Sequence, residues 1–357
     1  MEVLTAPAAR RRFARSLLAW FDAYARDLPW RRTRDLYSIW VSEIMLQQTQ
    51  VATVIGYYER FLQAFPDVAA LAAAPEQQVL RLWEGLGYYR RARQLHAAAK
   101  VIVSQHEGEF PRSYEAVRAL PGIGRYTAGA ILSIGLDQRL PILEANTIRV
   151  FSRLIALRAD PRTTASQARL WQVAEEIQPA DRCGAFNQAL MELGSELCTP
   201  KEPDCEHCPV AAQCAAREEN LTGQIPLAAK KMKYEDVTET AVVVRRRGKF
   251  LVRECQPGER WAGLWDFPRF ASLTAKEVGW LDAAREHLQN WLGVQIEPQA
   301  HLATTRHGVT RFRITLHVLD ARWLSGGQPS ESLRWVNRTE LALLPLSVTG
   351  RKIAGML

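Results

Sequence analysis

Length, composition and charge narrow the class of protein. The 357 residues exceed the usual size of one domain, so we expect two domains, each with its own core. With 47% hydrophobic and 24% charged residues, the chain has a globular composition that excludes wholesale disorder. The net charge of +8 suits a phosphate-rich partner, although an acidic protein or a membrane surface would also attract it. No run approaches 18 uninterrupted apolar residues, so we expect a cytoplasmic protein with no membrane partner.

Helical periodicity dominates the first two-thirds of the chain. Apolar residues recur three and four positions apart from Phe13 to Tyr24, and similar patterns follow over 68–82, 92–103 and 127–134. The sequence therefore predicts a mainly α domain over residues 1–219.

Later segments carry strand patterns. Thr240–Val244 and Lys249–Val252 are β-branched or apolar runs around Arg245–Gly248, which is typical of a hairpin. Apolar and polar residues alternate over 312–318, which predicts a strand with one buried face.

A segment without periodicity separates the two regions. Residues 220–236 hold Gly223, Pro226 and three lysines, so we expect an exposed linker. An α+β domain over 237–357 would follow it, and cleavage in the linker should release two domains.

Four of the six cysteines share one short segment. They are Cys198, Cys205, Cys208 and Cys214, and six, two and five residues separate them. Structural zinc sites usually pair two knuckles across a longer insert, whereas four cysteines on one short loop suit an iron–sulfur cubane. We therefore favour a cluster over zinc, and over a disulfide framework.

Two glycines mark a second feature. Gly122 and Gly124 lie in a tight turn that opens onto a helix expected to start near Thr127. Backbone N–H groups at such a turn, with the helix dipole behind them, can bind a phosphate oxygen without reading a base. An ordinary bend between two helices would give the same pattern.

Together, the cysteine spacing and the Leu-Pro-Gly-Ile-Gly turn resemble those of the endonuclease III and MutY class of DNA glycosylases. Ser42–Gln50 closely resembles a segment of MutY-type adenine glycosylases, and Trp261–Pro268 resembles a signature of their C-terminal Nudix-like domain. The resemblance implies a helix-hairpin-helix domain with a [4Fe-4S] loop remote from the chemistry. It also implies a Nudix-like domain that recognises 8-oxoguanine opposite adenine.

The same resemblance implies the catalytic residues. Glu43 would protonate N7 of adenine, because a purine leaves poorly as an anion. The family's catalytic aspartate falls at Glu144, followed by Ala145 and Asn146 where the family has Gly-Asn. A carboxylate there could stabilise an oxocarbenium ion or capture it covalently. Tyr126 stands where endonuclease III-like enzymes carry an attacking lysine, so we expect hydrolysis without strand cleavage.

Contacts with DNA follow by resemblance as well. Gln48 and Tyr88 would fill or pry apart the base stack while adenine is flipped. Trp30 and Arg31 would line the base pocket, although Trp30 is almost equally well explained as a core residue. Tyr89 is the tyrosine that we expect in the core.

In the second domain, the lesion-sensing loop of the family, H-x-F-S-H, corresponds to residues 307–311. Only His307 is unchanged, and Thr310 keeps a hydroxyl that could bond the oxidised base; a plain hairpin tip is the alternative. Gln289 and Asn290 replace the paired glutamates that a working Nudix hydrolase needs to hold magnesium, so pyrophosphatase activity is not expected.

These features predict a monomeric, monofunctional glycosylase that removes adenine opposite 8-oxoguanine or guanine in double-stranded DNA. Two alternatives stay open: a thymine glycosylase acting on T·G pairs, and a non-catalytic DNA-binding or redox-sensing relative with a decayed site at Glu144.

Overall fold

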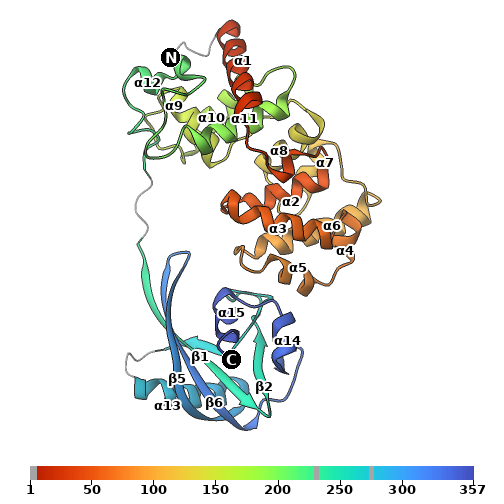
Figure 1. The fold of residues 1–357 in the computed structure, drawn as a ribbon, viewed down its shortest axis with the longest axis vertical. Helices are drawn as coiled ribbons and strands as arrows, with labels where there is room; N and C mark the ends of the chain where they lie inside the picture. The colour runs from red at the N-terminus through yellow and green to blue at the C-terminus, as the bar shows by residue number, and fades with distance from the viewer. Residues whose placement is uncertain (1–5, 229–232, 273–276) are drawn as a thin grey trace. The chain divides into compact units, whose positions relative to one another are not determined.

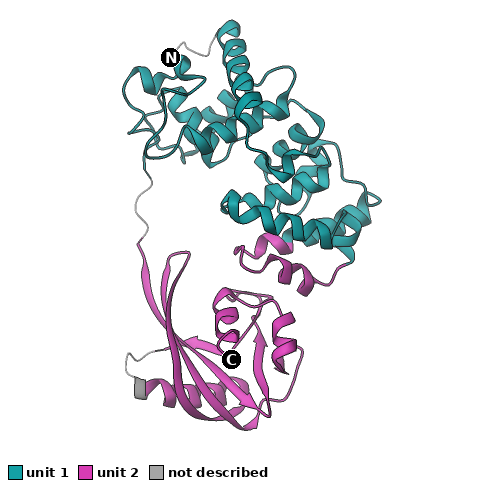
Figure 2. Ribbon diagram, viewed as in Figure 1, with its two compact units in different colours: residues 1–73, 94–230 teal, residues 74–93, 231–357 magenta. Residues whose placement is uncertain are grey.

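The computed structural model describes residues 6–228, 233–272 and 277–357 (Figure 1). The chain divides into two compact units, the first of residues 1–73 and 94–230 and the second of residues 74–93 and 231–357 (Figure 2). Residues 229–232 of the predicted linker lie outside the described residues. No described helix is long and apolar enough to cross a membrane.

The first unit is helical, as the sequence predicts. Its helices are α1 (Pro7–Tyr24), η1 (Pro29–Arg31), α2 (Leu36–Leu46), α3 (Val51–Ala64), α4 (Val68–Ala73), α6 (Arg90–Gln105), α7 (Tyr114–Ala119), α8 (Arg125–Leu136), α9 (Ala145–Leu154), α10 (Thr164–Ile177), α11 (Cys183–Glu196), η2 (Ala211–Gln213) and α12 (Ala215–Glu218). The continuous pattern over 68–82 is interrupted: α4 ends at Ala73 and α5 (Glu76–Trp83) begins after Pro75. Proline disfavours helical geometry in the residue before it, which explains the break.

Close packing of α11 against α8 fixes the centre of the first unit. A Cβ added to Gly184 would lie 2.3 Å from the carbonyl oxygen of Ser133, so only glycine permits this approach. Nearby, Asn187 Nδ2 donates to Ser133 Oγ at 2.8 Å and to the carbonyl of Leu140 at 2.9 Å. The two helices therefore hold their side chains in a fixed relation.

A mixed sheet with helices on both faces forms the second unit. Its elements are α5, β1 (Glu235–Arg246), β2 (Lys249–Glu254), β3 (Trp265–Asp266), β4 (Arg269–Ala271), α13 (Glu277–Leu292), β5 (Val294–Val309), β6 (Phe312–Gly326), β7 (Leu333–Val336), α14 (Arg338–Leu343) and α15 (Val348–Ala354). The strand order is β3-β2-β1-β6-β5, β1 and β6 run parallel, and β4 and β7 pair with β1 and β2.

The strand patterns are confirmed in part. The predicted hairpin joins β1 to β2, with Arg245 opposite Phe250 and positive φ at Arg247 and Gly248, as a tight two-residue turn requires. The alternation predicted over 312–318 is confirmed for Ile314, Leu316 and Val318, which share one buried face, and Arg313 on the other face is exposed. It fails at His317, because Trp280 of α13 covers the second face of β6 there. His317 is thereby buried, with its ring stacked 3.5 Å from that of Trp280.

Candidate active site

Glu43 lies on a helix that is almost entirely buried. The Asp35 side chain caps α2 by accepting from Ser38 N at 2.8 Å, and apolar side chains surround the helix. Only 4% of Glu43 is exposed, and this burial raises the pKa of its carboxyl group to about 7. The side chain can therefore hold a proton at neutral pH.

Tyr126 lies in the first turn of α8, which begins at Arg125, two residues before the predicted start. Its hydroxyl donates to Glu43 Oε2 at 2.7 Å and also contacts Met191 Sδ at 3.3 Å. Burial raises the pKa of Tyr126 well above its usual value, so the phenol stays protonated. Because the phenol occupies Oε2, the proton of the neutral acid belongs on the other carboxyl oxygen of Glu43.

Glu144 is the N-cap of α9. Its carboxylate accepts from the backbone N–H groups of Asn146 and Thr147, each at 2.9 Å, and Thr147 Oγ1 accepts from Glu144 N at 2.8 Å. The extra methylene of glutamate is accommodated by folding the side chain back onto the helix end. Burial raises the pKa of Glu144, and the two backbone hydrogen bonds oppose that rise.

Asn146 holds this helix end against α11. A Cβ on Gly194 would lie 2.6 Å from Asn146 Cβ, so the two helices touch at this point. The Asn146 side-chain oxygen accepts from Arg149 Nη2 at 2.8 Å, and Arg149 also donates to the carbonyl of Gly194 at 2.6 Å. Asn146 thus supports Glu144 through its backbone and the helix contact through its side chain.

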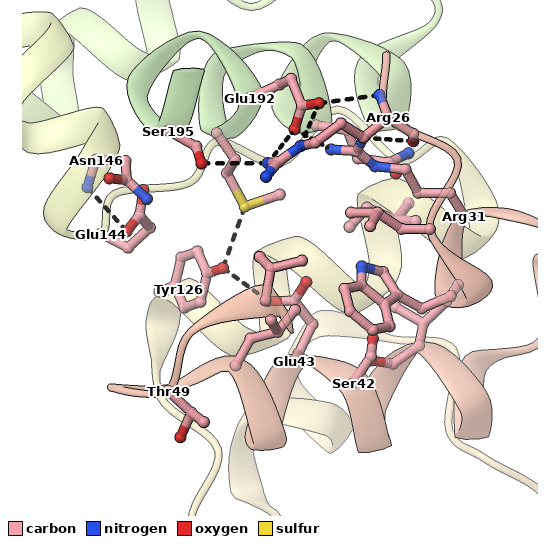
Figure 3. A pocket seen from close by; sticks show the side chains of 18 residues that line it. Arg26, Arg31, Ser42, Glu43, Thr49, Tyr126, Glu144, Asn146, Glu192 and Ser195 are labelled. Atoms are coloured by element: carbon pink, nitrogen blue, oxygen red, sulfur yellow. Dashed lines mark hydrogen bonds and ion pairs between the residues drawn. The ribbon is translucent and has the colours of Figure 1, made fainter. Parts of the chain in front are cut away.

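One cavity of about 160 Å³ brings these residues together (Figure 3). The predicted residues that line it are Trp30, Arg31, Glu43, Tyr126, Glu144 and Asn146. Glu43 and Tyr126 point toward each other across it, from α2 and α8 (Figure 3). Trp30 is both core and lining, because it is 7% exposed and packs edge-on against Tyr58.

Sequence reasoning missed the wall that α11 contributes. Gln188, Met191, Glu192 and Ser195 line the cavity, with Arg26 beside them. Their spacing of three, four and seven residues is also that of an ordinary core-facing helix stripe. The signal in the sequence was that Gln188, Glu192 and Ser195 are polar although they lie on one face of the helix.

Gln48 and Tyr88 share an unusual backbone conformation. Gln48 has φ of 58° in the turn after α2, and Tyr88 has φ of 49° after α5. Such left-handed conformations cost energy in residues other than glycine and concentrate at functional sites. Tyr88 is 54% exposed whereas Tyr89 is 8% exposed, as expected for the surface and core members of the pair.

The glycine turn leaves one helix end open. Gly122 has φ of 78°, and a Cβ there would lie 2.7 Å from Gln94 Cβ. Gly124 is the N-cap of α8, has no side-chain capping bond, and its missing Cβ would face open space. The first N–H groups of α8 are therefore available to an anion.

The four thiols of Cys198, Cys205, Cys208 and Cys214 lie on the chain between α11 and α12 and form no disulfide. Cys198, Cys208 and Cys214 pack against the core of the first unit, and Arg153 Nη1 lies 3.2 Å from Cys198 Sγ. Burial raises the pKa of Cys208 to about 12, and the other three thiols act on it electrostatically. The described residues contain no group of three or more His, Cys, Asp or Glu side chains arranged for a metal ion. The chemistry of four thiols that act on one another electrostatically, one of them beside a guanidinium, suits an anionic cluster, although their present arrangement does not form a metal site.

The tip of the second unit's β5–β6 hairpin carries Thr310. Its φ is 50°, and its hydroxyl donates to the carbonyl of Val309 at 2.7 Å. Thr310, His307 and Tyr88 line one cavity of about 510 Å³ within this unit. Arg269 can only donate to His307 Nε2, at 3.3 Å, so this imidazole is neutral with its proton on Nδ1; its pKa is lowered to about 4 by burial.

Comparisons with known proteins define the class. Residues 41–176 match the HhH-GPD superfamily of base excision DNA repair proteins, and residues 240–355 match the NUDIX domain. A thermostable thymine-DNA glycosylase superposes with a TM-score of 0.54 at 29% identity, over 59% of this chain and 97% of that one. An endonuclease III–DNA complex shares the fold, with a TM-score of 0.50 at 18% identity over 59% and 98%. The fold of the first unit and its family match are those of a helix-hairpin-helix base-excision protein.

Whole-chain relatives narrow this class. The adenine DNA glycosylase of Homo sapiens is 42% identical over 96% of this chain and 73% of its own length, and that of Rattus norvegicus is 34% identical over 96% and 77%. The chain spans about half, 52%, of the Mus musculus enzyme, at 42% identity. The chain belongs to the adenine DNA glycosylase family, which confirms the predicted resemblance and fold class.

Proposed function

We propose that this protein hydrolyses the N-glycosidic bond of adenine mispaired in duplex DNA and leaves the strand intact. The observation that carries the proposal is the cavity that holds a buried carboxyl group with a pKa raised to about 7, Glu43, together with a second carboxylate, Glu144, fixed on a helix end. Two carboxyl groups with separate roles are what glycosidic hydrolysis requires.

In this mechanism Glu43 donates its proton to a ring nitrogen of the flipped adenine, so that the base leaves as a neutral molecule. The phenol of Tyr126 keeps the acid oriented through Oε2. Glu144 stabilises the positive charge that develops on the sugar, and water adds to the anomeric carbon. The added water releases one proton to solvent, and the ionised Glu43 takes one up, so the acid is restored. No lysine lines the cavity among the described residues, which supports hydrolysis rather than amine attack and strand cutting.

For the duplex, we propose a phosphate contact at the open N-terminus of α8, beside Gly122 and Gly124. Gln48 and Tyr88 would act on the base stack, since both are exposed in strained left-handed conformations. Thr310 would contact the base opposite adenine, 8-oxoguanine or guanine. Its hydroxyl, which is now bonded to the adjacent carbonyl, has to rotate to do so.

We also propose that Cys198, Cys205, Cys208 and Cys214 hold a [4Fe-4S] cluster. When bound, such a cluster supplies structural order and negative charge to its loop rather than a catalytic group. Equal amounts of iron and acid-labile sulfide in the purified protein would support the assignment, and zinc would contradict it.

Base release separates this function from that of a thymine glycosylase. Single-turnover reactions on duplexes with A·8-oxoG, A·G or T·G should release adenine from the first two and leave T·G intact. Strand breaks should appear only after alkali treatment. Faster release of thymine than adenine, or breaks without alkali, would contradict the proposal.

A further inference from the structure

Glu192 is a buried anion that the catalytic scheme does not use. It lies on the cavity-facing side of α11, and its side chain is only 1% exposed. Despite this burial, the pKa of Glu192 is lowered to about 2, because the hydrogen bonds from Arg26 and Arg31 outweigh desolvation. It therefore carries a fixed negative charge at every pH at which the protein would act.

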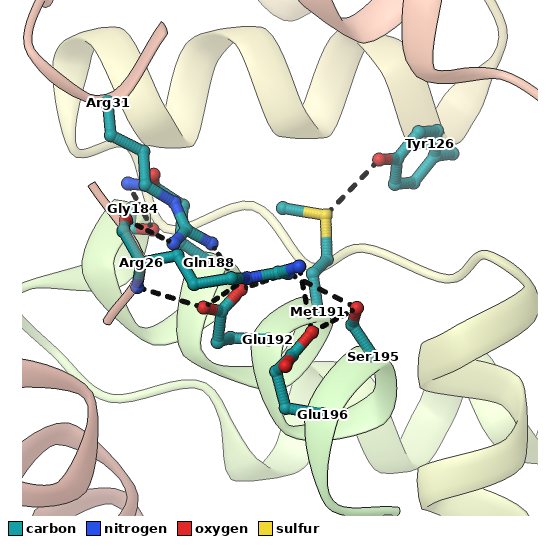
Figure 4. A network of polar contacts seen from close by, with 9 residues as sticks. All are labelled: Arg26, Arg31, Tyr126, Gly184, Gln188, Met191, Glu192, Ser195 and Glu196. Atoms are coloured by element: carbon teal, nitrogen blue, oxygen red, sulfur yellow. Dashed lines mark hydrogen bonds and ion pairs between the residues drawn. The ribbon is translucent and has the colours of Figure 1, made fainter. Parts of the chain in front are cut away.

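Two arginines converge on this carboxylate (Figure 4). Arg26 donates from its backbone N–H at 3.0 Å, from Nε at 2.8 Å and from Nη2 at 2.6 Å. Arg31 donates from Nη2 at 2.9 Å. Both carboxylate oxygens are thus used, and the bidentate contact fixes the plane of the Arg26 guanidinium.

The network also ties the arginines to each other. Arg31 Nη1 donates to the carbonyl of Arg26 at 3.0 Å, and its guanidinium lies 5.1 Å from the centre of the Phe21 ring. A guanidinium has five N–H donors, so these contacts leave Arg31 with donors to present to the cavity that it lines. The acceptor nitrogens on the edge of a purine are the groups that such donors recognise.

We propose that Glu192 is a positioning residue for base recognition: it locks Arg26 and Arg31 into the cavity wall and offsets their charge beside Glu43. The inference rests on the proposed function, since it requires that this side of the cavity binds a purine base. Glu192 itself touches the arginines and not the reacting atoms.

The charge of Glu192 has a consequence for Glu43. The groups that act on Glu43 are Tyr126 from α8, Glu144 at the start of α9 and Arg31 from η1, and Arg31 lowers the pKa of Glu43. With Glu192 neutralised, the positive charge of Arg31 is uncompensated. The pKa of Glu43 should then fall, and the acid should lose its proton at a lower pH.

Glu196 offers a matched control on the same helix. Its Oε1 accepts from Arg26 Nη1 at 2.7 Å, but its side chain is 44% exposed. Glu196→Gln removes the same charge from the same arginine without disturbing Arg31, and an exposed ion pair contributes little. Glu192→Asp keeps the charge of Glu192 but shortens its reach to the two arginines.

The experiment is single-turnover adenine release as a function of pH for the parent, Glu192→Gln, Glu192→Asp and Glu196→Gln, with affinity for an uncleavable duplex measured alongside. Both Glu192 variants should slow release by about 10- to 100-fold, because small misplacements of binding groups have effects of this size. Only Glu192→Gln should move the alkaline limb of the rate profile to lower pH. Glu196→Gln should stay within about twofold of the parent.

Circular dichroism and thermal unfolding would give the folded fraction of each variant, against which its rate is compared. If the Glu192 variants lose activity only in proportion to the unfolded fraction, or if Glu192→Gln behaves like Glu196→Gln, the inference is overturned while the proposed function stands. Should Glu192→Gln not fold, an Asp variant that folds and releases adenine at the parent rate would overturn it. A parent that is inert on every adenine mispair would overturn the proposed function and this inference together.

Discussion

At the residue scale, the hydrogen bond from Tyr126 to Glu43 sets the pH range of the acid. The bond favours the ionised carboxylate and so opposes the effect of burial, and the balance leaves the pKa of Glu43 at about 7. Tyr126→Phe should therefore raise the pKa of Glu43 and move the alkaline limb of the rate profile upward, by about one pH unit. The measurement is single-turnover adenine release between pH 5 and 9, and an unchanged or lowered limb would contradict this role.

The burial of Glu43 should also make the free energy of unfolding depend on pH. The native pKa of Glu43, about 7, exceeds the ordinary value of 4.5, so the native state binds this proton more tightly than the unfolded state. The resulting stability is present below pH 4.5 and is lost as pH rises to 7. Glu43→Gln removes the titration, so its stability relative to the parent should rise by about 3 kcal/mol across this window and then level off.

Chemical denaturation of both proteins at several pH values would measure this difference. A constant difference between parent and variant would mean that Glu43 is not desolvated in the native protein.

At the element scale, Glu144 joins catalysis to the end of α9. Aspartate is a favoured N-cap and the family's residue at this position, so Glu144→Asp should keep the cap and release adenine at a rate within about tenfold of the parent. Glu144→Ala should lose the cap, about 1 kcal/mol of stability, and nearly all activity. An inert parent that the aspartate variant revives would instead identify a DNA-binding protein with a decayed site.

The glycine turn allows a matched pair of substitutions. Gly122→Ala meets positive φ and Gln94 Cβ, so it should destabilise the fold by about 1 kcal/mol or more. Gly124→Ala has room, so it should unfold at nearly the parent temperature but bind duplex DNA more weakly, if phosphate approaches α8 there. Thermal unfolding and duplex binding at one fixed salt concentration would separate the two effects, and equal DNA affinity of parent and Gly124→Ala would exclude that contact.

The sequence predicted features that are continuous along the chain better than contacts between residues far apart in the chain. The segment containing Glu43 and the turn containing Gly122 are continuous in sequence, so their motifs could be recognised directly. The contacts of Glu192 could not be recognised in this way, because its carboxylate binds Arg26 and Arg31, which lie about 160 positions earlier in the chain. Burial of His317 was missed for the same reason, since the covering ring of Trp280 comes from a separate helix.

At the scale of the whole molecule, we propose the predicted boundary between residues 1–219 and 237–357, although residues 74–93 belong to the second compact unit. Ile225 is anchored to the first unit, because Arg153 Nε donates to its carbonyl at 2.8 Å, whereas Leu227 and Tyr234 are exposed. Trypsin should therefore cut first at the lysines of 230–233 and yield two resistant fragments. First cuts elsewhere would contradict this linker.

We also propose that the protein is a monomer. Light scattering should give the mass of one chain, and a larger mass would contradict this proposal.

The central claim is that one cavity holds both the acid that protonates adenine and the carboxylate that stabilises the sugar cation. The most direct test is single-turnover release from an A·8-oxoG duplex by the parent, Glu43→Gln and Glu144→Gln, with duplex affinity measured in parallel. Both variants should bind with similar affinity and release adenine at least about a hundredfold more slowly. Undiminished adenine release in both would contradict the account.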